Sequence, residues 1–284
     1  MKFSVLTYDF GRYGKPRPPK EIDECAEYVY VTDVDEPPSP FVRKSLKAGC
    51  GSPLLDCQYV KHHPFEFVSS DVVVVMDSSI EICRKMEPLV DAFLELDADA
   101  MFISNPFATD FMKEMNSRTW MPENKRCTAK QREIELEFLK RFDEVRLNIE
   151  GMFYILRKCD MTDRLMNSIV GKCDWLLKAG GIPRPCQVLY SATVANEFKD
   201  EVENGKIAFM SSWQIRGNGT LMRTYNNHHA GNVPNRPMSC RITANILGRE
   251  VTLHEFRELD RIADVKKPTQ PIQKHVDWDM TDDD

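Results

Sequence analysis

Polar residues follow three apolar runs in the first third of the chain, and each of them could contact a ligand. They are Thr7, Tyr8, Asp9, Thr32, Asp33, Asp77, Ser78 and Ser79. Ligands of open α/β sheets bind beyond the carboxyl ends of the strands, so we expect these residues to line one site. Carboxylate oxygens bind hard divalent cations, so Asp77 is a candidate metal ligand. The alternative is that Asp77 caps a helix near residues 81–87.

A phosphate-binding site in this chain would lack a glycine-rich loop. Neither G-x-G-x-x-G nor G-x-x-x-x-G-K-[ST] occurs in the sequence, so a classical dinucleotide site or a P-loop is not indicated. Phosphates then require a metal ion or basic side chains, and Arg43, Lys44 and Lys47 are candidates for the latter. Tyr8 is either a core aromatic residue or a stacking surface for uracil. Asp33 is either a turn residue or an acceptor for the base or ribose of a nucleotide.

The elements that would position these residues alternate between strands and helices. Apolar runs predict strands at residues 2–11, 26–33, 71–76, 100–104 and 147–158, and a strand and turn at 205–219. Helical patterns predict helices at residues 41–49, 83–99, 128–144, 161–181, 186–198 and 251–264, with Thr162 as the N-cap of the fourth. This order predicts one α/β domain over residues 1–265, with a mostly parallel central sheet and helices on both faces. An acidic tail follows at residues 266–284.

The composition is that of a folded protein without a nucleic-acid partner. Of the 284 residues 42% are hydrophobic, and the net charge is −6 with no dense Lys/Arg block. The apolar stretches are too short for a signal peptide or a transmembrane helix, so we expect a soluble, cytoplasmic protein. The nine cysteines form no C-x-x-C pair and are expected to be reduced thiols rather than zinc ligands. The adjacent pair His62 and His63 is typical of an exposed loop.

The predicted strand ends belong to an ordered series of segments that resembles a known family. The segments "AEYVYVTD", "SPFVRKSLK", "HHPFEF" and "VVVVMDSSIEI" resemble, in order and spacing, GT-A-fold glycosyltransferases of plants and bacteria that include mucilage-related members. The segments "NIEGMFYILRKCD" and "RPCQVLYS" resemble later parts of that family, so the resemblance covers about residues 28–190. It implies a Rossmann-like GT-A fold. It also implies transfer of a sugar from a nucleotide donor, for which a UDP-sugar is expected, to a hydroxyl of a glycan in polysaccharide biosynthesis.

A more distant resemblance, to glycogenin-like retaining glycosyltransferases, implies a metal site. Those enzymes have a D-x-D motif at the end of the central strand and a late H-x-x-G motif, and both motifs bind the metal ion. The matching positions here are Asp77, Ser79 and His228. They imply a Mn²⁺ or Mg²⁺ site in which a serine replaces the second aspartate. The D-Q motif of that family is matched by Cys186 and Gln187, so only the glutamine is retained.

The predicted strand ends and the two resemblances together indicate a donor site and an acceptor site. The expected donor-binding residues are Thr7, Tyr8, Asp33, Arg43, Lys47, Asp77, Ser78 and Ser79. An inverting enzyme needs a general base beside the acceptor hydroxyl, and Glu150 is the candidate for it. A retaining enzyme needs no such base, and the match at Gln187 favours retention.

Two other functions stay open on the sequence. A sugar-phosphate nucleotidyltransferase would have a glycine-rich basic signature at the first strand, to which "LTYDFGRYGKPRPPK" is a loose match. A non-catalytic protein that binds nucleotides or glycans would keep the same fold. In that protein Ser79 and Cys186 would mark a lost active site.

Overall fold

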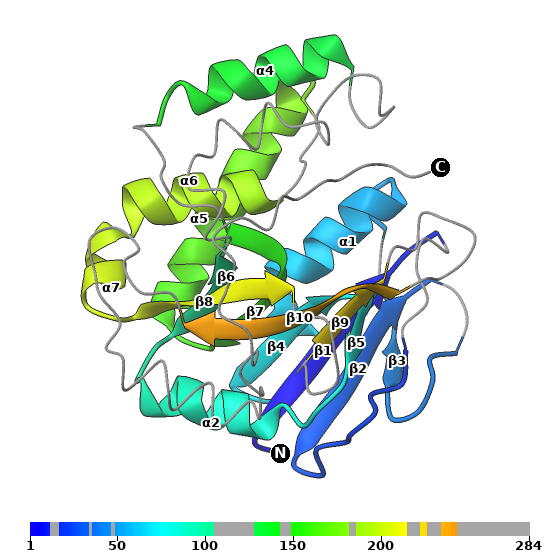
Figure 1. Ribbon diagram of the computed structural model, residues 1–284. Coiled ribbons are helices and arrows are strands. Elements are labelled where there is room, and N and C mark those ends of the chain that lie inside the picture. The colour runs from blue at the N-terminus through cyan, green and yellow to red at the C-terminus, as the bar shows by residue number, and fades with distance from the viewer. Residues whose placement is uncertain are drawn as a thin grey trace.

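The computed structural model describes residues 1–11, 17–33, 36–46, 49–104, 128–142, 149–181, 186–214, 222–225 and 234–242. Within these residues one sheet has the strand order β3-β2-β1-β4-β7-β6-β8-β10-β9-β5 (Figure 1). The strands are β1 (Phe3–Asp9), β2 (Ala26–Thr32), β3 (Val42–Lys44), β4 (Val72–Asp77), β5 (Ile80–Ile82), β6 (Ala100–Ser104), β7 (Ile149–Arg157), β8 (Ile207–Gln214), β9 (Met222–Tyr225) and β10 (Pro234–Ile242). The helices are α1 (Pro53–His62), α2 (Glu87–Glu95), α4 (Ala129–Leu139), α5 (Asp160–Lys178), α6 (Cys186–Glu197) and α7 (Lys199–Glu203), with a short 3₁₀ helix at Pro64–Glu66.

The strands around the centre of the sheet run in one direction with one exception. β3, β2, β1 and β4 pair in parallel, and so do β6 and β8. β7 lies between β4 and β6 and is antiparallel to both. The last three strands, β10, β9 and β5, form an antiparallel extension. The prediction of an α/β fold with a mostly parallel central sheet is therefore confirmed.

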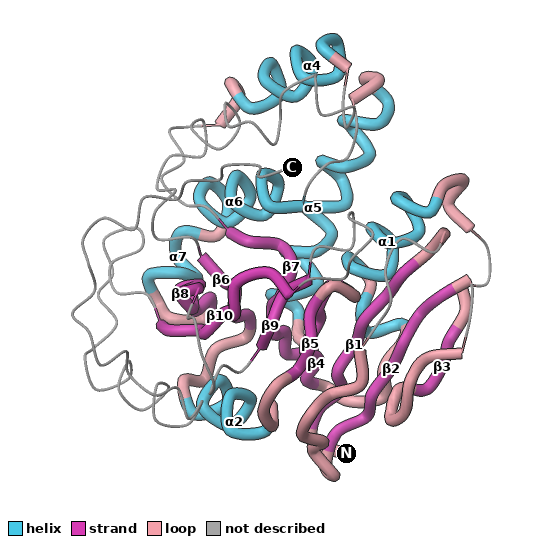
Figure 2. Tube along the Cα trace, turned by 45° about the vertical axis from the view of Figure 1, so that its right-hand side comes forward, coloured by secondary structure: helices cyan, strands magenta, loops and turns pink. Residues whose placement is uncertain are grey.

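Helices cover both faces of this sheet, as the sequence predicts (Figures 1 and 2). The core on one face joins β1 and β4 to α1, α5 and α6, and it includes Val73, Val75 and Leu165. The core on the other face joins the same strands to α2, and it includes Val74 and Phe93. Successive strand residues point to opposite faces. The valine run is buried on both sides because helices cover both sides.

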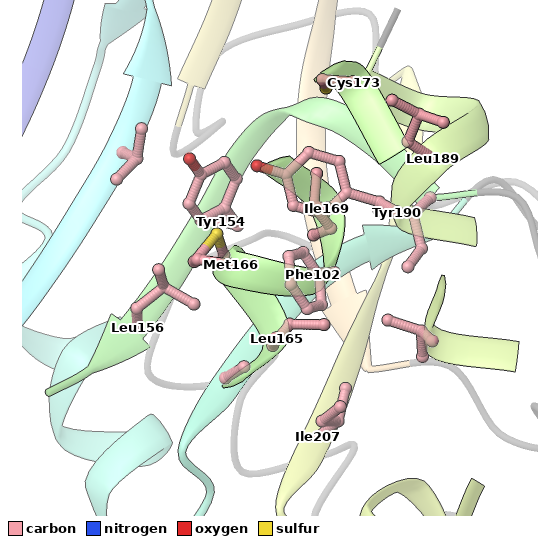
Figure 3. Packing of buried hydrophobic residues seen from close by; sticks show 14 of the residues in the cluster. Phe102, Tyr154, Leu156, Leu165, Met166, Ile169, Cys173, Leu189, Tyr190 and Ile207 are labelled. Carbon is pink, nitrogen blue, oxygen red and sulfur yellow. The ribbon is translucent and has the colours of Figure 1, made fainter. Parts of the chain in front are cut away.

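An aromatic cluster packs α6 against the centre of the sheet (Figure 3). The ring centroids of Phe102, Tyr154 and Tyr190 are separated by 5.7, 5.5 and 5.6 Å, and all three side chains are fully buried. They come from β6, β7 and α6, respectively. Aromatic pairs in this range contribute about 0.5–1.5 kcal/mol beyond the burial of their area. The cluster therefore fixes α6, which contains Gln187, to β6 and β7.

One predicted helix is a strand in the structure. The sequence predicts a helix at residues 41–49, but Val42–Lys44 forms β3. β3 pairs in parallel with residues 29–31 of β2 at the edge of the sheet. Pairing with a neighbouring strand thus overrides the local helical pattern, as tertiary context often does.

The N-cap of α5 also differs from the prediction. α5 begins at Asp160, and its N-cap is Cys159 rather than Thr162. Thr162 lies at the third helical position, where its hydroxyl oxygen accepts a hydrogen bond from the Cys159 N–H at 3.2 Å. The helix ends at Lys178, and Gly180 follows it with a φ of +83°. The threonine hydroxyl, inside the first turn, therefore provides a hydrogen-bond acceptor for the N–H of the N-cap residue.

A buried carboxylate fixes the loop that precedes β2. Asp23 accepts hydrogen bonds from the N–H groups of Met86 and Glu87 at the start of α2, at 2.9 and 3.0 Å. The Tyr28 hydroxyl donates to the same carboxylate at 3.2 Å. Asp23 is only 1% exposed. Because the first N–H groups of a helix lack partners within the helix, Asp23 both caps α2 and holds it to the β2 loop.

Of the remaining predicted helices, three are present in the structure and one lies outside the described residues. The helices expected at 83–99, 128–144 and 186–198 are present as α2, α4 and α6. The helix expected at 251–264, the tail at 266–284 and therefore the end of the domain at residue 265 lie outside the described residues. Among the described helices, none combines the length and the apolar character needed to cross a bilayer.

Candidate functional site

The carboxyl ends of β2, β1 and β4 lie side by side at one edge of the sheet. β1 is the middle strand, and its register pairs Tyr8 with Asp77 and Asp9 with Thr32. The three strand-end segments singled out in the sequence therefore meet at one edge, as predicted. In open α/β sheets this is the edge at which ligands bind.

The carboxylate of Asp77 has two partners at this edge, and both contact the same oxygen. The Tyr8 hydroxyl donates to Asp77 Oδ1 at 2.5 Å, and the Lys61 Nζ lies 3.2 Å from the same atom. The side chain of Lys61 is 9% exposed and that of Asp77 is 36% exposed. Within the described residues Oδ2 accepts no hydrogen bond, so this second oxygen is available to a ligand.

Asp77 does not cap a helix, which was the alternative open on the sequence. The residues after the turn at Ser78 and Ser79 form strand β5 (Ile80–Ile82). The next helix, α2, begins at Glu87 and takes its capping carboxylate from Asp23. The N-cap interpretation of Asp77 is therefore wrong.

Lys61 is the residue of this site that the sequence analysis missed. It lies in the last turn of α1, a helix that was not predicted, and its carbonyl oxygen accepts a hydrogen bond from the Tyr154 hydroxyl. The signal that could have found the helix is Ser52 followed by a proline at the first helical position. In the structure Ser52 accepts from the Leu55 N–H at 3.3 Å. The lysine ammonium thus reaches Asp77 from a helix fixed at both ends.

The neighbouring His62 is buried, in contrast to the exposed loop expected for this histidine pair. It is 4% exposed, and its ring lies 5.9 Å from that of Tyr190. Burial, and then the positive charges of Lys61 and His63, lower the pKa of His62 to about 3. His62 is therefore a neutral residue of the core at physiological pH. Its Nε2 atom has no hydrogen-bond partner in the described part of the chain.

Thr7 and Tyr8 point to opposite faces of the sheet, so the structure brings only Tyr8 to Asp77. Tyr8 is 6% exposed, and the Lys61 Nζ lies 5.9 Å from the centre of its ring. Of its two alternatives, Tyr8 is thus a core aromatic residue, with a hydroxyl that reaches the site. Thr7 is fully buried, and its hydroxyl has no hydrogen-bond partner among the described residues.

Asp33 is exposed just beyond β2, where a main-chain contact fixes its carboxylate. Both carboxylate oxygens accept from the Gly11 N–H, at 3.1 and 3.2 Å. Gly11 has a φ of +69°, and a Cβ at this position would lie 2.8 Å from Pro53 Cγ. Only glycine fits both conditions. The contact therefore connects the ends of β1 and β2 to the start of α1.

The predicted basic residues of the donor site are not gathered at Asp77. Arg43 lies exposed in the edge strand β3, with β2 and β1 between it and β4. Three strand spacings separate these positions by about 14 Å. Lys47 lies outside the described residues, as does the predicted metal ligand His228. Ser78 and Ser79 are partly exposed in the turn after β4.

The backbones of the two predicted catalytic residues lie close to each other. Glu150 is the second residue of β7, and Gln187 is the second residue of α6. The Ile149 N–H donates to Ser191 Oγ at 2.9 Å, which joins the start of β7 to the second turn of α6. β7 is antiparallel to β4, so its first residues lie at the same edge as the end of β4. The structure does not describe the two side chains.

A divalent ion would find part of its coordination at the Asp77 turn. Across the described residues no three His, Cys, Asp or Glu side chains converge to hold a metal ion. Asp77 Oδ2 and the hydroxyls of Ser78 and Ser79 are oxygen donors of the kind that Mg²⁺ and Mn²⁺ prefer. Such a set fits an ion that takes its other ligands from phosphates or water.

Comparisons with known proteins give a structural likeness only. No family model matches the sequence, and no curated protein matches it. Two crystal structures of S. aureus TarS, one of residues 1–349, share 17% identity with 37% of this chain at a TM-score of 0.25. The chain covers only 36% and 22% of those two structures. Mouse xyloside xylosyltransferase 1, in its apo form, shares 8% identity over 74% of this chain and 84% of its own, at a TM-score of 0.39.

Proposed function

We propose that this protein is a GT-A glycosyltransferase that transfers a sugar from a nucleotide donor, a UDP-sugar, to a hydroxyl of a glycan. The observation that carries the proposal is the convergence of Asp77, Lys61 and Asp33 at the carboxyl edge of three adjacent parallel strands. The ordered resemblance between residues 28 and 190 and glycosyltransferase segments supports the same function. A cytoplasmic location and a role in polysaccharide biosynthesis are part of this proposal.

In this proposal the diphosphate of the donor lies at the Asp77 turn and its nucleoside lies toward Asp33. Lys61 contributes a positive charge beside the diphosphate. Asp33 is exposed and fixed by Gly11, so it can accept hydrogen bonds from ribose hydroxyls or from a base N–H. The Tyr8 hydroxyl holds the Asp77 carboxylate in place.

Mn²⁺ or Mg²⁺ is the proposed cofactor, with Asp77, Ser79 and His228 as its protein ligands. When bound, the ion would act as a Lewis acid for the diphosphate leaving group. The place of β9 supports the assignment of His228, although that residue is outside the described part. Thr224 of β9 pairs with Ile80 of β5. Thr224 lies four positions before His228 in the sequence, and Ile80 lies three positions after Asp77.

The transfer exchanges one bond of the anomeric carbon for another. The bond between C1 of the sugar and the diphosphate oxygen breaks, and its electron pair leaves with the diphosphate. The acceptor hydroxyl oxygen forms the new bond to C1 and loses its proton. Glu150 would accept this proton in an inverting reaction. In the retaining reaction, which the match of Gln187 to the D-Q motif favours, no protein base is required.

Release of nucleoside diphosphate from a panel of nucleotide sugars tests this function. With Mn²⁺ present, the wild-type protein should hydrolyse a UDP-sugar slowly and should release UDP faster when a suitable glycan is added. Asp77→Asn should lower both rates at least a hundredfold, because the oxygen set at the turn loses its charge. Asp71→Asn is the matched control, since Asp71 precedes the same strand at the opposite edge of the sheet. If the protein binds UDP but releases no nucleoside diphosphate from any nucleotide sugar, it is instead a non-catalytic binding protein.

A further inference from the structure

The carboxylate of Asp77 has a positive partner on α1. The Lys61 Nζ lies 3.2 Å from Oδ1, and its side chain is 9% exposed. Lys61 is largely removed from water, whereas the Asp77 side chain is 36% exposed, so solvent partly screens the pair. Tyr8 donates to the same oxygen as a neutral partner. One of the two groups that contact Asp77 is therefore a cation, and its charge lowers the attraction of this carboxylate for a second cation.

The remaining oxygen donors at the turn are weak ligands without a further negative charge. Ser79 stands where a second carboxylate would double the charge of the site, and a neutral hydroxyl does not replace it. Within the described chain no other acidic, histidine or cysteine side chain completes a group of three with Asp77. A divalent ion that approaches the turn thus meets one partly exposed carboxylate, with the Lys61 ammonium beside it.

We infer that Lys61 sets the order of binding at this site, so that the divalent ion enters only with, or after, the diphosphate of the nucleotide. This inference rests on the proposed function. A diphosphate brings two to three negative charges and several oxygen ligands to the turn. Those charges outweigh that of Lys61, so Asp77 Oδ2 could then hold the ion together with ligands supplied by the nucleotide. The free protein therefore stays without metal until the donor arrives.

Binding of Mn²⁺, followed by calorimetry and by the electron paramagnetic resonance of the free ion, tests this order. The wild-type protein alone should bind Mn²⁺ at least tenfold more weakly than the protein saturated with UDP, after subtraction of Mn²⁺ bound to UDP in solution. By linkage, Mn²⁺ should strengthen UDP binding by the same factor relative to EDTA. Lys61→Met should bind Mn²⁺ in the absence of nucleotide about tenfold or more tightly than wild type, because a charge within a few ångströms is removed.

Two further variants serve as controls. Lys206→Met removes a lysine whose carboxylate partner is Asp97 rather than Asp77, so Mn²⁺ binding to the free protein should change less than threefold. Lys61→Gln repeats the neutral change with a polar side chain, in case Lys61→Met fails to fold. Equal Mn²⁺ affinity with and without UDP in the wild type would overturn the inference and leave donor binding intact. Absence of UDP binding under every condition would overturn the proposed function as well.

Discussion

Replacement of Gly11 by alanine perturbs the contact that holds Asp33 at the candidate donor site. The φ of +69° at Gly11 is disfavoured for alanine, and the new methyl group would lie 2.8 Å from Pro53 Cγ. The left-handed conformation costs about 1–2 kcal/mol, and the steric overlap adds about 1–3 kcal/mol unless α1 shifts. We therefore expect Gly11→Ala to lower the free energy of unfolding by about 2–5 kcal/mol.

Two other glycines separate conformational strain from steric overlap in this experiment. Gly51 has a φ of +96°, and a methyl group added there would meet no atom within 4 Å, so Gly51→Ala should cost only the conformational part, about 1–2 kcal/mol. Gly171 lies inside α5 with open space around it, so Gly171→Ala should stabilise the protein by about 0.5–1 kcal/mol. Urea denaturation measures all three. If Gly11→Ala costs no more than Gly51→Ala, then the contact with Pro53 does not constrain this turn.

Three further predictions concern groups that are fixed or buried. Asp23→Ala should lower the free energy of unfolding by about 2–4 kcal/mol, because two N–H groups at the start of α2 lose a charged partner; a change below about 0.5 kcal/mol in urea denaturation would contradict the cap. Ser191→Ala should cost about 1–3 kcal/mol, since the buried Ile149 N–H loses its acceptor; a negligible change in unfolding free energy would mean that this N–H finds another acceptor. His62 has a folded-state pKa of about 3 against 6.5 in the unfolded chain, so the unfolded chain binds the proton first as the pH falls. Stability is therefore complete above about pH 6.5 and should fall by about 1–2 kcal/mol by about pH 5, and His62→Gln should flatten this profile; an equal slope in that variant would assign the effect to other groups.

The sequence was sufficient for the parts of the fold that depend on local pattern. The valine run before Asp77 predicted a strand in a sheet with helices on both faces, and the cores on both faces bury this strand. The strand ends predicted one edge for Tyr8, Asp33 and Asp77, and parallel pairing brings them there. These features follow from side-chain periodicity and from the rule for ligand sites in parallel sheets.

The parts that depend on contacts between distant segments could not be predicted in this way. Residues 42–44 form a strand only because β2 offers them an edge. Lys61 reaches Asp77 because α1 packs on the sheet, and no local pattern encodes that distance. One error was avoidable. Alternation along β1 already places Thr7 and Tyr8 on opposite faces, so they cannot contact one ligand in the same way.

A crystal structure of the full chain with UDP and Mn²⁺ would show directly where the nucleotide binds. We expect the diphosphate at the turn after β4, within contact of Asp77 and the Lys61 ammonium, with the nucleoside toward Asp33. A nucleotide bound at the amino-terminal edge of the sheet, or on the outer surface of α5 and α6, would refute the proposed donor site.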